Sequence, residues 1–172
     1  KEIQIVYNMG RKFAAARLRL GMPTRKAGCP KKGSSMRIVV CDDELDEVEA
    51  ICAHLKEICK QTGIQAELRG FVSCEEFLAY TAKNYVDIVF LDICMGAYNG
   101  IDAARILRRT NETCAIVFVT ASREYAVDAF DVTACHYLVK PATPAKLREA
   151  LHRTQRLHHE RRTLSIVSNY IN

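Results

Sequence analysis

The stretch Val86-Asp87-Ile88-Val89-Phe90-Leu91-Asp92 decides the fold of this 172-residue chain. It is a short, largely apolar run that ends in an acidic residue, Asp92. A run of this kind, bounded by polar residues, is typical of a strand that is buried on both faces. The pattern recurs along the chain. Three further apolar runs end in polar residues, and one segment alternates like an edge strand: Ile38–Cys41 before Asp42, Ala115–Val119 before Thr120, Cys135–Val139 before Lys140, and Ile64–Phe71.

Segments with helical periodicity separate these runs. Residues Leu45–Gln61 repeat apolar positions at helical spacing, and Gly63 is predicted to end that helix. Ser73 and Glu76 form a capping box that opens a second helix through Tyr80. Three more helices are predicted, from Asn99-Gly100 to about Leu107, over Arg123–Phe130, and from Thr143 to about His159.

The alternation of buried strands with amphipathic helices predicts an α/β fold with a parallel sheet covered on both faces. Five strands and five helices within residues 36–160 fit a flavodoxin-like, doubly wound sheet with strand order 2-1-3-4-5. The arginines of the third helix, Arg105, Arg108 and Arg109, are predicted to form an exposed face.

Residues 1–35 differ from the rest of the chain in charge and composition. They hold nine Lys or Arg residues and one Glu, whereas the remainder holds 16 basic and 19 acidic residues. Gly, Pro, Lys and Ser are mixed from Gly21 to Ser35, which is linker composition, and Phe13–Leu20 has the composition of a short helix. Because Met36 resembles a natural start residue, we interpret residues 1–35 as a poorly ordered, basic N-terminal extension or linker. A basic segment can contact nucleic acid or membrane, but a solvated extension is the simpler interpretation.

The eight cysteines predict reduced thiols in a cytoplasmic protein. No C-x-x-C pair occurs among them, so the spacing of a metal site is absent. Most of them lie in apolar runs, where cysteine packs as a small hydrophobic residue. No apolar run approaches the length of a membrane span and no signal-peptide layout is present, so no membrane partner is expected.

Five polar residues follow strands of the predicted sheet: Asp42 and Asp43, Asp92, Thr120 and Lys140. Because the carboxyl ends of parallel strands share one edge, these residues are expected to converge in one crevice. Three carboxylates close together repel one another. A bound Mg²⁺, which prefers oxygen ligands, is expected to neutralise this repulsion. The lysine adds fixed positive charge and the threonine hydroxyl can donate to a phosphoryl oxygen. Such surroundings let a carboxylate attack a phosphoryl group whose charge is already neutralised.

Taken in order, the motifs resemble those of response-regulator receiver domains, over Met36 to roughly Arg156. Five motifs carry the resemblance: Val40-Cys41-Asp42-Asp43, Phe90-Leu91-Asp92-Ile93-Cys94-Met95, Asn99-Gly100, Val119-Thr120-Ala121 and Tyr137-Leu138-Val139-Lys140-Pro141. Each motif alone is weak, but their order, each beside an apolar run, is specific.

The resemblance implies a regulatory phosphoacceptor rather than an enzyme. Asp92 would be phosphorylated by a sensor histidine kinase. Asp43, Asp92 and the backbone carbonyl of Cys94 would hold Mg²⁺, with Asp42 acting through water.

The resemblance also implies a switch. Lys140 would pair with the phosphoryl group, Thr120 would move toward it, and Tyr137 would turn inward into the space that Thr120 leaves. The Lys140-Pro141 bond would be cis, which only an X-Pro bond adopts at small cost.

Within the family, Glu124-Tyr125-Ala126 followed by Phe130 resembles receivers attached to LytTR DNA-binding domains. Two residues depart from that pattern: Gly96 stands where proline is frequent, which predicts a looser loop, and His136 stands where an acid is frequent. Residues 161–172 look like a linker and the truncated start of an output domain. The resemblance therefore implies a homodimer on activation and binding to DNA only through an output domain that this sequence lacks.

Three other functions fit less well. A haloacid-dehalogenase-type phosphatase needs an acid two positions after its nucleophile, where this chain has Cys94. A flavodoxin-like electron carrier needs a phosphate-binding loop after the first strand, but Asp42-Asp43-Glu44 would repel phosphate. A receiver fold that acts as an interaction module without phosphorylation remains the alternative, and the complete set of five polar residues argues against it.

Overall fold

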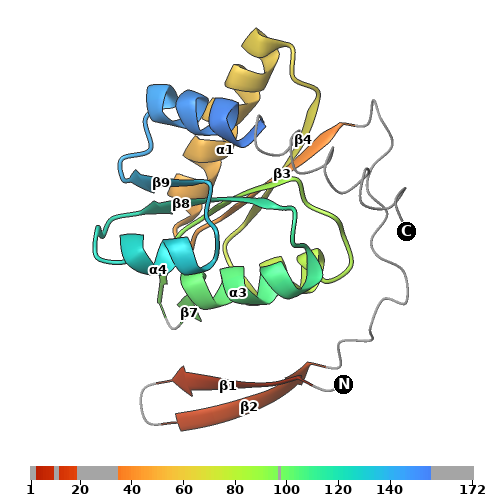
Figure 1. Ribbon diagram of the computed structural model, residues 1–172, viewed down its shortest axis with the longest axis vertical. Coiled ribbons are helices and arrows are strands. Elements are labelled where there is room, and N and C mark those ends of the chain that lie inside the picture. The colour runs from red at the N-terminus through yellow and green to blue at the C-terminus, as the bar shows by residue number, and fades with distance from the viewer. Residues whose placement is uncertain (1–2, 10–11, 19–34, 97, 156–172) are drawn as a thin grey trace, which may run out of the picture.

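The computed structural model describes residues 3–9, 12–18, 35–96 and 98–155, and its centre is a parallel sheet (Figure 1). In spatial order the five strands are β4 (Ala66–Phe71), β3 (Met36–Cys41), β5 (Ile88–Leu91), β8 (Ala115–Thr120) and β9 (His136–Val139). Every neighbouring pair is parallel. Counted along the chain within this sheet, the order is 2-1-3-4-5, and the predicted fold is confirmed.

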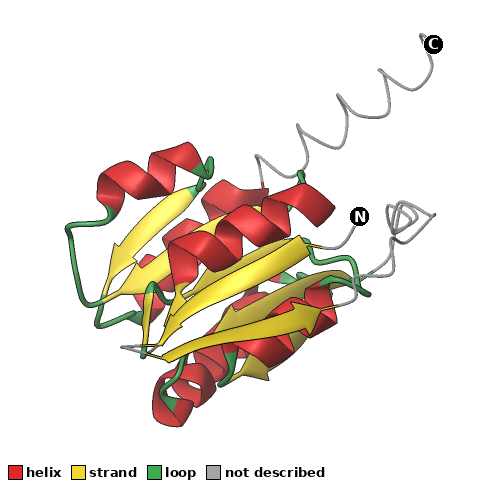
Figure 2. Ribbon diagram, turned by 90° about the horizontal axis from the view of Figure 1, so that it is seen from below, coloured by secondary structure: helices red, strands yellow, loops and turns green. Residues whose placement is uncertain are grey.

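Helices cover both faces of the sheet (Figure 2). They are α1 (Leu45–Thr62), α2 (Cys74–Thr81), α3 (Gly100–Thr110), α4 (Ala126–Asp131) and a fifth helix over residues 144–155. Helix α1 and the fifth helix pack on one face, and α2, α3 and α4 pack on the other. In the described part of the chain, no helix combines the length and apolar content needed to cross a bilayer.

The alternation of side chains along each strand divides the core in two. In β5, Val89 and Leu91 pack toward α2, α3 and α4, whereas Ile88 and Phe90 pack toward α1 and the fifth helix. All four are at most 1% exposed, as expected of a central strand that is covered on both faces.

Local signals set the helix ends as predicted. Gly63 has φ +71°, and its left-handed conformation ends α1. The Ser73 hydroxyl accepts a hydrogen bond from the backbone N–H of Glu76 at 3.3 Å, which caps α2. Boundaries moved slightly: the edge strand begins at Ala66 rather than at Ile64.

One prediction for the N-terminal region is wrong. The stretch predicted as a short helix lies mostly in strand β2 (Lys12–Leu18), which pairs antiparallel with β1 (Ile3–Met9) over seven residue pairs. Two residues separate the strands, and β1 is rich in Ile, Val and Tyr, so local strand pairing outweighs the helix propensity of the alanines. The predicted linker from Gly21 to Ser35, apart from Ser35 itself, and the output segment over residues 161–172 lie outside the described residues.

Candidate functional site

Three carboxylates converge at the carboxyl edge of the sheet. Asp42 and Asp43 directly follow β3, and Asp92 directly follows β5. One oxygen from each carboxylate lies within 4.8 Å of the others. Asp42 is 1% exposed and Asp92 is 4% exposed, whereas Asp43 faces solvent. Neighbouring parallel strands that end together have therefore concentrated negative charge in one small volume.

Lys140, which follows β9, partly neutralises this charge. Its Nζ lies 2.7 Å from Asp42 Oδ2 and 3.2 Å from Asp92 Oδ2. Burial alone would lower the pKa of the ammonium, but its close contact with the Asp42 carboxylate and the nearby carboxylate charges outweigh burial, so the pKa is raised. One ammonium faces three carboxylates, and the site keeps an excess of negative charge that favours a cation.

Backbone amides fix the orientation of the two buried carboxylates. Asp92 Oδ1 accepts hydrogen bonds from the N–H of Ile93 at 2.6 Å and of Cys94 at 3.3 Å. Asp42 Oδ1 accepts one from the N–H of Glu44 at 3.0 Å. Among the described residues, the buried Asp42 Oδ2 has the ion pair with Lys140 but no hydrogen-bond partner.

The donor set suits a hard divalent cation such as Mg²⁺. Carboxylate oxygens are the ligands that Mg²⁺ prefers, and a partly open site lets it keep bound water. The exposed Asp43 leaves such an opening, and Asp42 Oδ2 is an oxygen with unused acceptor capacity. The backbone carbonyl of Cys94, two residues after Asp92, remains a predicted ligand.

The loop after Asp92 has a structure that the sequence did not predict. Two short strands, β6 (Cys94–Met95) and β7 (Tyr98–Asn99), pair antiparallel across it. Gly96 adopts φ +55°, a conformation closed to proline, so a proline at this position would need a different loop. The Tyr98 hydroxyl donates a hydrogen bond to the Glu75 carboxylate at the start of α2, which ties the loop to its neighbour.

A glycine is required at position 100 because the backbone there lies very close to the backbone of Asp92. A Cβ at this position would lie 2.0 Å from the backbone oxygen of Asp92. The Gly100 N–H donates to the carbonyl of Ile93 at 2.9 Å, and the Asn99 side chain caps α3 by accepting from the N–H of Ile101 at 2.8 Å. The Asn99-Gly100 motif therefore fixes the N-terminal end of α3 against the backbone of Asp92.

Thr120 and Tyr137 are linked through the backbone of Ser122. The Thr120 hydroxyl is buried and accepts from the Ser122 N–H at 3.4 Å. The Tyr137 hydroxyl donates to the Ser122 carbonyl at 2.8 Å, so this side chain points toward the segment between β8 and α4. Burial raises the pKa of Tyr137, which therefore stays a hydrogen-bond donor at neutral pH. The Lys140-Pro141 bond is cis, as predicted.

The cysteines near the site differ in exposure. Cys41 and Cys74 are buried, and burial raises the pKa of both thiols, that of Cys74 to about 12. Cys94 is exposed, with its sulfur 3.9 Å from the Thr120 hydroxyl. The seven cysteines of the described residues are thiols rather than members of disulfides.

Arg108 corrects the prediction of an exposed arginine face on α3. Arg105 and Arg109 are exposed, but Arg108 is half-buried and its guanidinium donates to backbone carbonyls at the ends of two neighbouring segments, including Val132 and Thr133. Helical spacing identified the polar side of α3, but it could not reveal that α4 ends beside that side.

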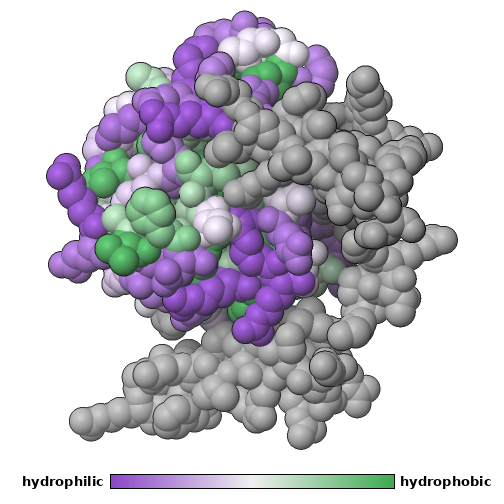
Figure 3. Space-filling view, in the orientation of Figure 1, coloured by the Kyte–Doolittle hydropathy of each residue, from purple (hydrophilic) through white to green (hydrophobic). Residues whose placement is uncertain are grey.

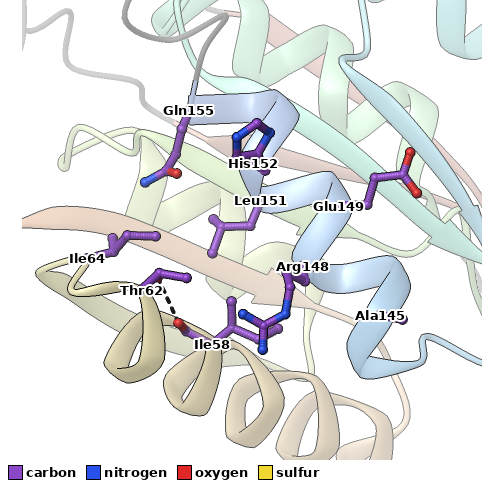
Figure 4. Close-up of a pocket in the computed structure, with 9 residues that line it drawn as sticks. All are labelled: Ile58, Thr62, Ile64, Ala145, Arg148, Glu149, Leu151, His152 and Gln155. Atoms are coloured by element: carbon purple, nitrogen blue, oxygen red, sulfur yellow. Dashed lines mark hydrogen bonds between the residues drawn. The ribbon is translucent and has the colours of Figure 1, made fainter.

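A second hollow, of about 670 Å³, lies between α1 and the fifth helix (Figure 4). Ile58 and Leu151 form part of its apolar wall, and Arg148 and His152 lie at its polar side. Ile58 is 13 residues beyond the start of α1, about 20 Å along the helix axis from the end that adjoins the carboxylates. None of the predicted site residues lines this hollow.

Comparison with known proteins gives a consistent result. The family model described as "Response regulator receiver domain" matches residues 38–152. The chain is 36% identical over 120 residues to the sensory transduction protein LytT of Bacillus anthracis, covering 67% of this chain and 46% of that protein. It is 30% identical over 120 residues to the transcriptional regulatory protein LytR of Staphylococcus aureus, covering 70% of this chain and 47% of that protein.

Solved structures agree with the sequence relatives. The response regulatory domain of mrkE from Klebsiella pneumoniae superposes with a TM-score of 0.64 at 26% identity, covering 73% of this chain and 99% of that one. A CheY-like receiver from Methanospirillum hungatei superposes with a TM-score of 0.62 at 22% identity, covering 74% and 99%, which supports the fold alone. The chain spans about half the length of the curated relatives that it matches.

Proposed function

Because the chain belongs to the response regulator receiver family, which supplies the regulatory phosphoacceptors of two-component signalling rather than classical enzymes, we propose that Asp92 accepts a phosphoryl group from a sensor histidine kinase. One observation carries the proposal: Lys140 lies within 3.2 Å of both Asp42 and Asp92, inside a cluster of three carboxylates. This arrangement keeps a carboxylate oriented while leaving room for cations that neutralise an incoming phosphoryl group.

In the proposed transfer, a carboxylate oxygen of Asp92 forms a bond to phosphorus as the bond between phosphorus and the kinase imidazole breaks. The released imidazole keeps the electron pair of that bond and takes up a proton. Asp92 Oδ1 is held by the amides of Ile93 and Cys94, and Oδ2 is held by Lys140, so the attacking group is fixed before the donor arrives.

Mg²⁺ would be held by Asp43, Asp92 and the Cys94 carbonyl, and by Asp42 through water. When bound, it neutralises charge on the transferring phosphoryl group. Lys140 would then exchange part of its contact with Asp92 for a phosphoryl oxygen.

The proposed output is a shift between two conformations of the segment after Thr120. A phosphoryl group on Asp92 would attract the Thr120 hydroxyl and disturb its hydrogen bond with the Ser122 N–H. Ser122 also accepts the Tyr137 hydroxyl, so the change would reach the start of α4.

The surface of α4 supports a proposed homodimer on activation. Val127 is 76% exposed and Phe130 is 81% exposed, although both are large hydrophobic residues. Figure 3 shows hydrophobic groups interrupting the polar surface over α4. Exposed apolar groups that lie together are typical of protein contact sites.

We also propose the arrangement of the remaining chain: a basic extension over residues 1–35, a receiver over residues 36–160, and a linker over residues 161–172 that leads to a LytTR-type output domain. The similarity to LytT and LytR supports this proposal. DNA binding would belong to that output domain. Transfer is proposed to occur in the cytoplasm, in keeping with the reduced thiols of the described residues.

The test uses the full chain incubated with acetyl phosphate, with and without Mg²⁺, and reads the intact mass. We expect a Mg²⁺-dependent phosphoryl adduct in the wild type and in Asp102→Asn, an exposed acid on α3, and none in Asp92→Asn. A folded wild-type protein that takes no adduct would refute the proposal and favour a receiver fold that acts as an interaction module without phosphorylation.

A further inference from the structure

The guanidinium of Arg108 contacts four backbone carbonyls. Its Nε donates to Val132 O at 2.9 Å, and Nη2 donates to Thr133 O at 3.1 Å. Its Nη1 donates to Glu112 O at 3.2 Å and to Cys114 O. One side chain at the end of α3 is therefore bonded both to the segment that enters β8 and to the segment that leaves α4.

The segment that leaves α4 has an unfavourable backbone conformation. Thr133 adopts φ +51°, a left-handed conformation that β-branched residues rarely take and that glycine usually supplies at a helix end. The N–H of Thr133 donates to Phe130 O at 2.9 Å, and the N–H of Ala134 donates to Ala129 O at 3.1 Å. Such strain persists where the surroundings over-determine the conformation, and the two Arg108 hydrogen bonds supply that constraint.

The other end of α4 is attached to the switch residues. Thr120 and Tyr137 both bond to Ser122, three residues before the Tyr125 N-cap of α4. A change at the phosphoryl site would therefore reach α4 at its N-terminal end.

Helix α3 is itself fixed at both ends. Its first residue, Gly100, is bonded to Ile93 O beside the phosphoacceptor, and Arg108 in its last turn holds the end of α4. Figure 1 shows α3 and α4 on the same face of the sheet.

We infer that Arg108 is a positioning residue that fixes the C-terminal end of α4, so that phosphorylation of Asp92 turns α4 about a pivot at Val132–Thr133. The turning of α4 on phosphorylation rests on the proposed function, whereas the anchoring of α4 by Arg108 is a property of the unmodified chain. A guanidinium is needed because its planar set of five N–H donors spans several carbonyls, which the single ammonium of lysine cannot do.

Amide hydrogen exchange on the full chain, before and after treatment with acetyl phosphate and Mg²⁺, tests the inference. In unmodified Arg108→Met we expect the amides of Thr133 and Ala134 to exchange about tenfold faster or more, because the end of α4 opens locally. Arg109→Met removes an exposed arginine one residue further along α3 and should leave both rates unchanged. Arg108→Lys should resemble Arg108→Met, because it restores the charge but not the set of donors.

On phosphorylation, the wild type should change exchange at residues 122–128 and keep the rates of residues 132–134, whereas Arg108→Met should change both. Equal rates in Arg108→Met and Arg109→Met, or a wild type whose residues 132–134 respond to phosphorylation, would overturn the inference. If Arg108→Met does not fold, Arg108→Lys provides the same comparison. Absence of the adduct in wild type refutes the proposed function, and the exchange rates of the unmodified variants then still decide whether Arg108 anchors α4.

Discussion

The two ends of the parallel sheet both bury acids, but with opposite consequences. At the carboxyl end, Asp42 and Asp92 share the Lys140 ammonium, and Asp43 completes a cluster of three carboxylates. At the amino end, Asp87 is 2% exposed and its Oδ2 accepts a hydrogen bond from the Arg37 N–H at 2.8 Å. Burial alone therefore does not identify a functional acid. What distinguishes the carboxyl end is an excess of like charge that the described residues do not neutralise.

The amino end uses its polar side chains to complete the backbone hydrogen bonds of strands and turns. Asn111 is 7% exposed, and its amide nitrogen donates to Val86 O at 2.8 Å while its oxygen accepts from the Cys114 N–H at 3.1 Å. Buried groups with fixed partners favour a single conformation. The amino end is therefore expected to contribute stability, and the carboxyl end to contribute function at the expense of stability.

The largest effect is expected from Gly100→Ala, which tests how rigidly the carboxyl end is built. The added Cβ would lie 2.0 Å from the Asp92 backbone oxygen, so α3 or Asp92 must move. We expect the free energy of unfolding to fall by about 3 kcal/mol and the phosphoryl adduct to be lost, as measured by urea unfolding and intact mass. Gly63→Ala is the control, since nothing lies within 4 Å there and only the positive φ is strained, at a cost of about 1 kcal/mol. Equal losses in the two variants would show that the close approach does not matter.

Asp87→Ala tests the amino end directly. The variant leaves the backbone N–H of Arg37 without the carboxylate that it now contacts, and we expect the free energy of unfolding to fall by about 2 kcal/mol. The phosphoryl adduct should still form, because Asp87 precedes β5 while Asp92 follows it. A folded Asp87→Ala protein that takes no adduct would contradict the division of roles between the two ends.

The sequence predicted the fold because each signal was local. Runs such as Ile88–Leu91 are apolar throughout, so they fit only strands covered on both faces, and the polar residue after each run marked the shared edge. The convergence of Asp42, Asp43 and Asp92 followed from topology, since parallel strands end at one edge. Their roles in metal binding and phosphoryl transfer remain predictions.

The features that the sequence did not predict depend on contacts between distant segments. Arg108 looked like a solvated arginine, because nothing in α3 reveals that the carbonyls of Val132 and Thr133 lie beside it. The pairing of β6 with β7 depends on the left-handed Gly96, and glycine alone does not specify which conformation it adopts. The β1–β2 hairpin was missed because pairing between strands outweighed the helix propensity of the alanines.

Addition of Mg²⁺ tests whether the unneutralised charge at the carboxyl end is a binding site. At a Mg²⁺ concentration ten times Kd, selective binding to the folded state raises the free energy of unfolding by about 1.4 kcal/mol. Urea unfolding should show this gain in the wild type. Asp43→Asn removes an exposed carboxylate of the cluster, so its stability without Mg²⁺ should be unchanged or slightly higher and its gain with Mg²⁺ should be smaller. The same gain in both proteins would place the cation elsewhere.

The smallest effect is expected from His136, the first residue of β9. This prediction tests whether His136 makes the stability of the protein depend on mildly acidic pH. Burial lowers the pKa of His136 below its ordinary value of 6.5, the positive charge of Arg153 lowers it further, and Glu149 opposes both. Between that lowered pKa and 6.5 the unfolded chain binds more protons than the folded one, so stability falls as pH drops through this window. Urea unfolding at about pH 7.5 and about pH 5.5 should show a decrease in the wild type that is smaller in His136→Asn, whereas the exposed His152→Asn should behave as the wild type. If His136→Asn keeps the full decrease, the pH dependence must come from groups other than His136.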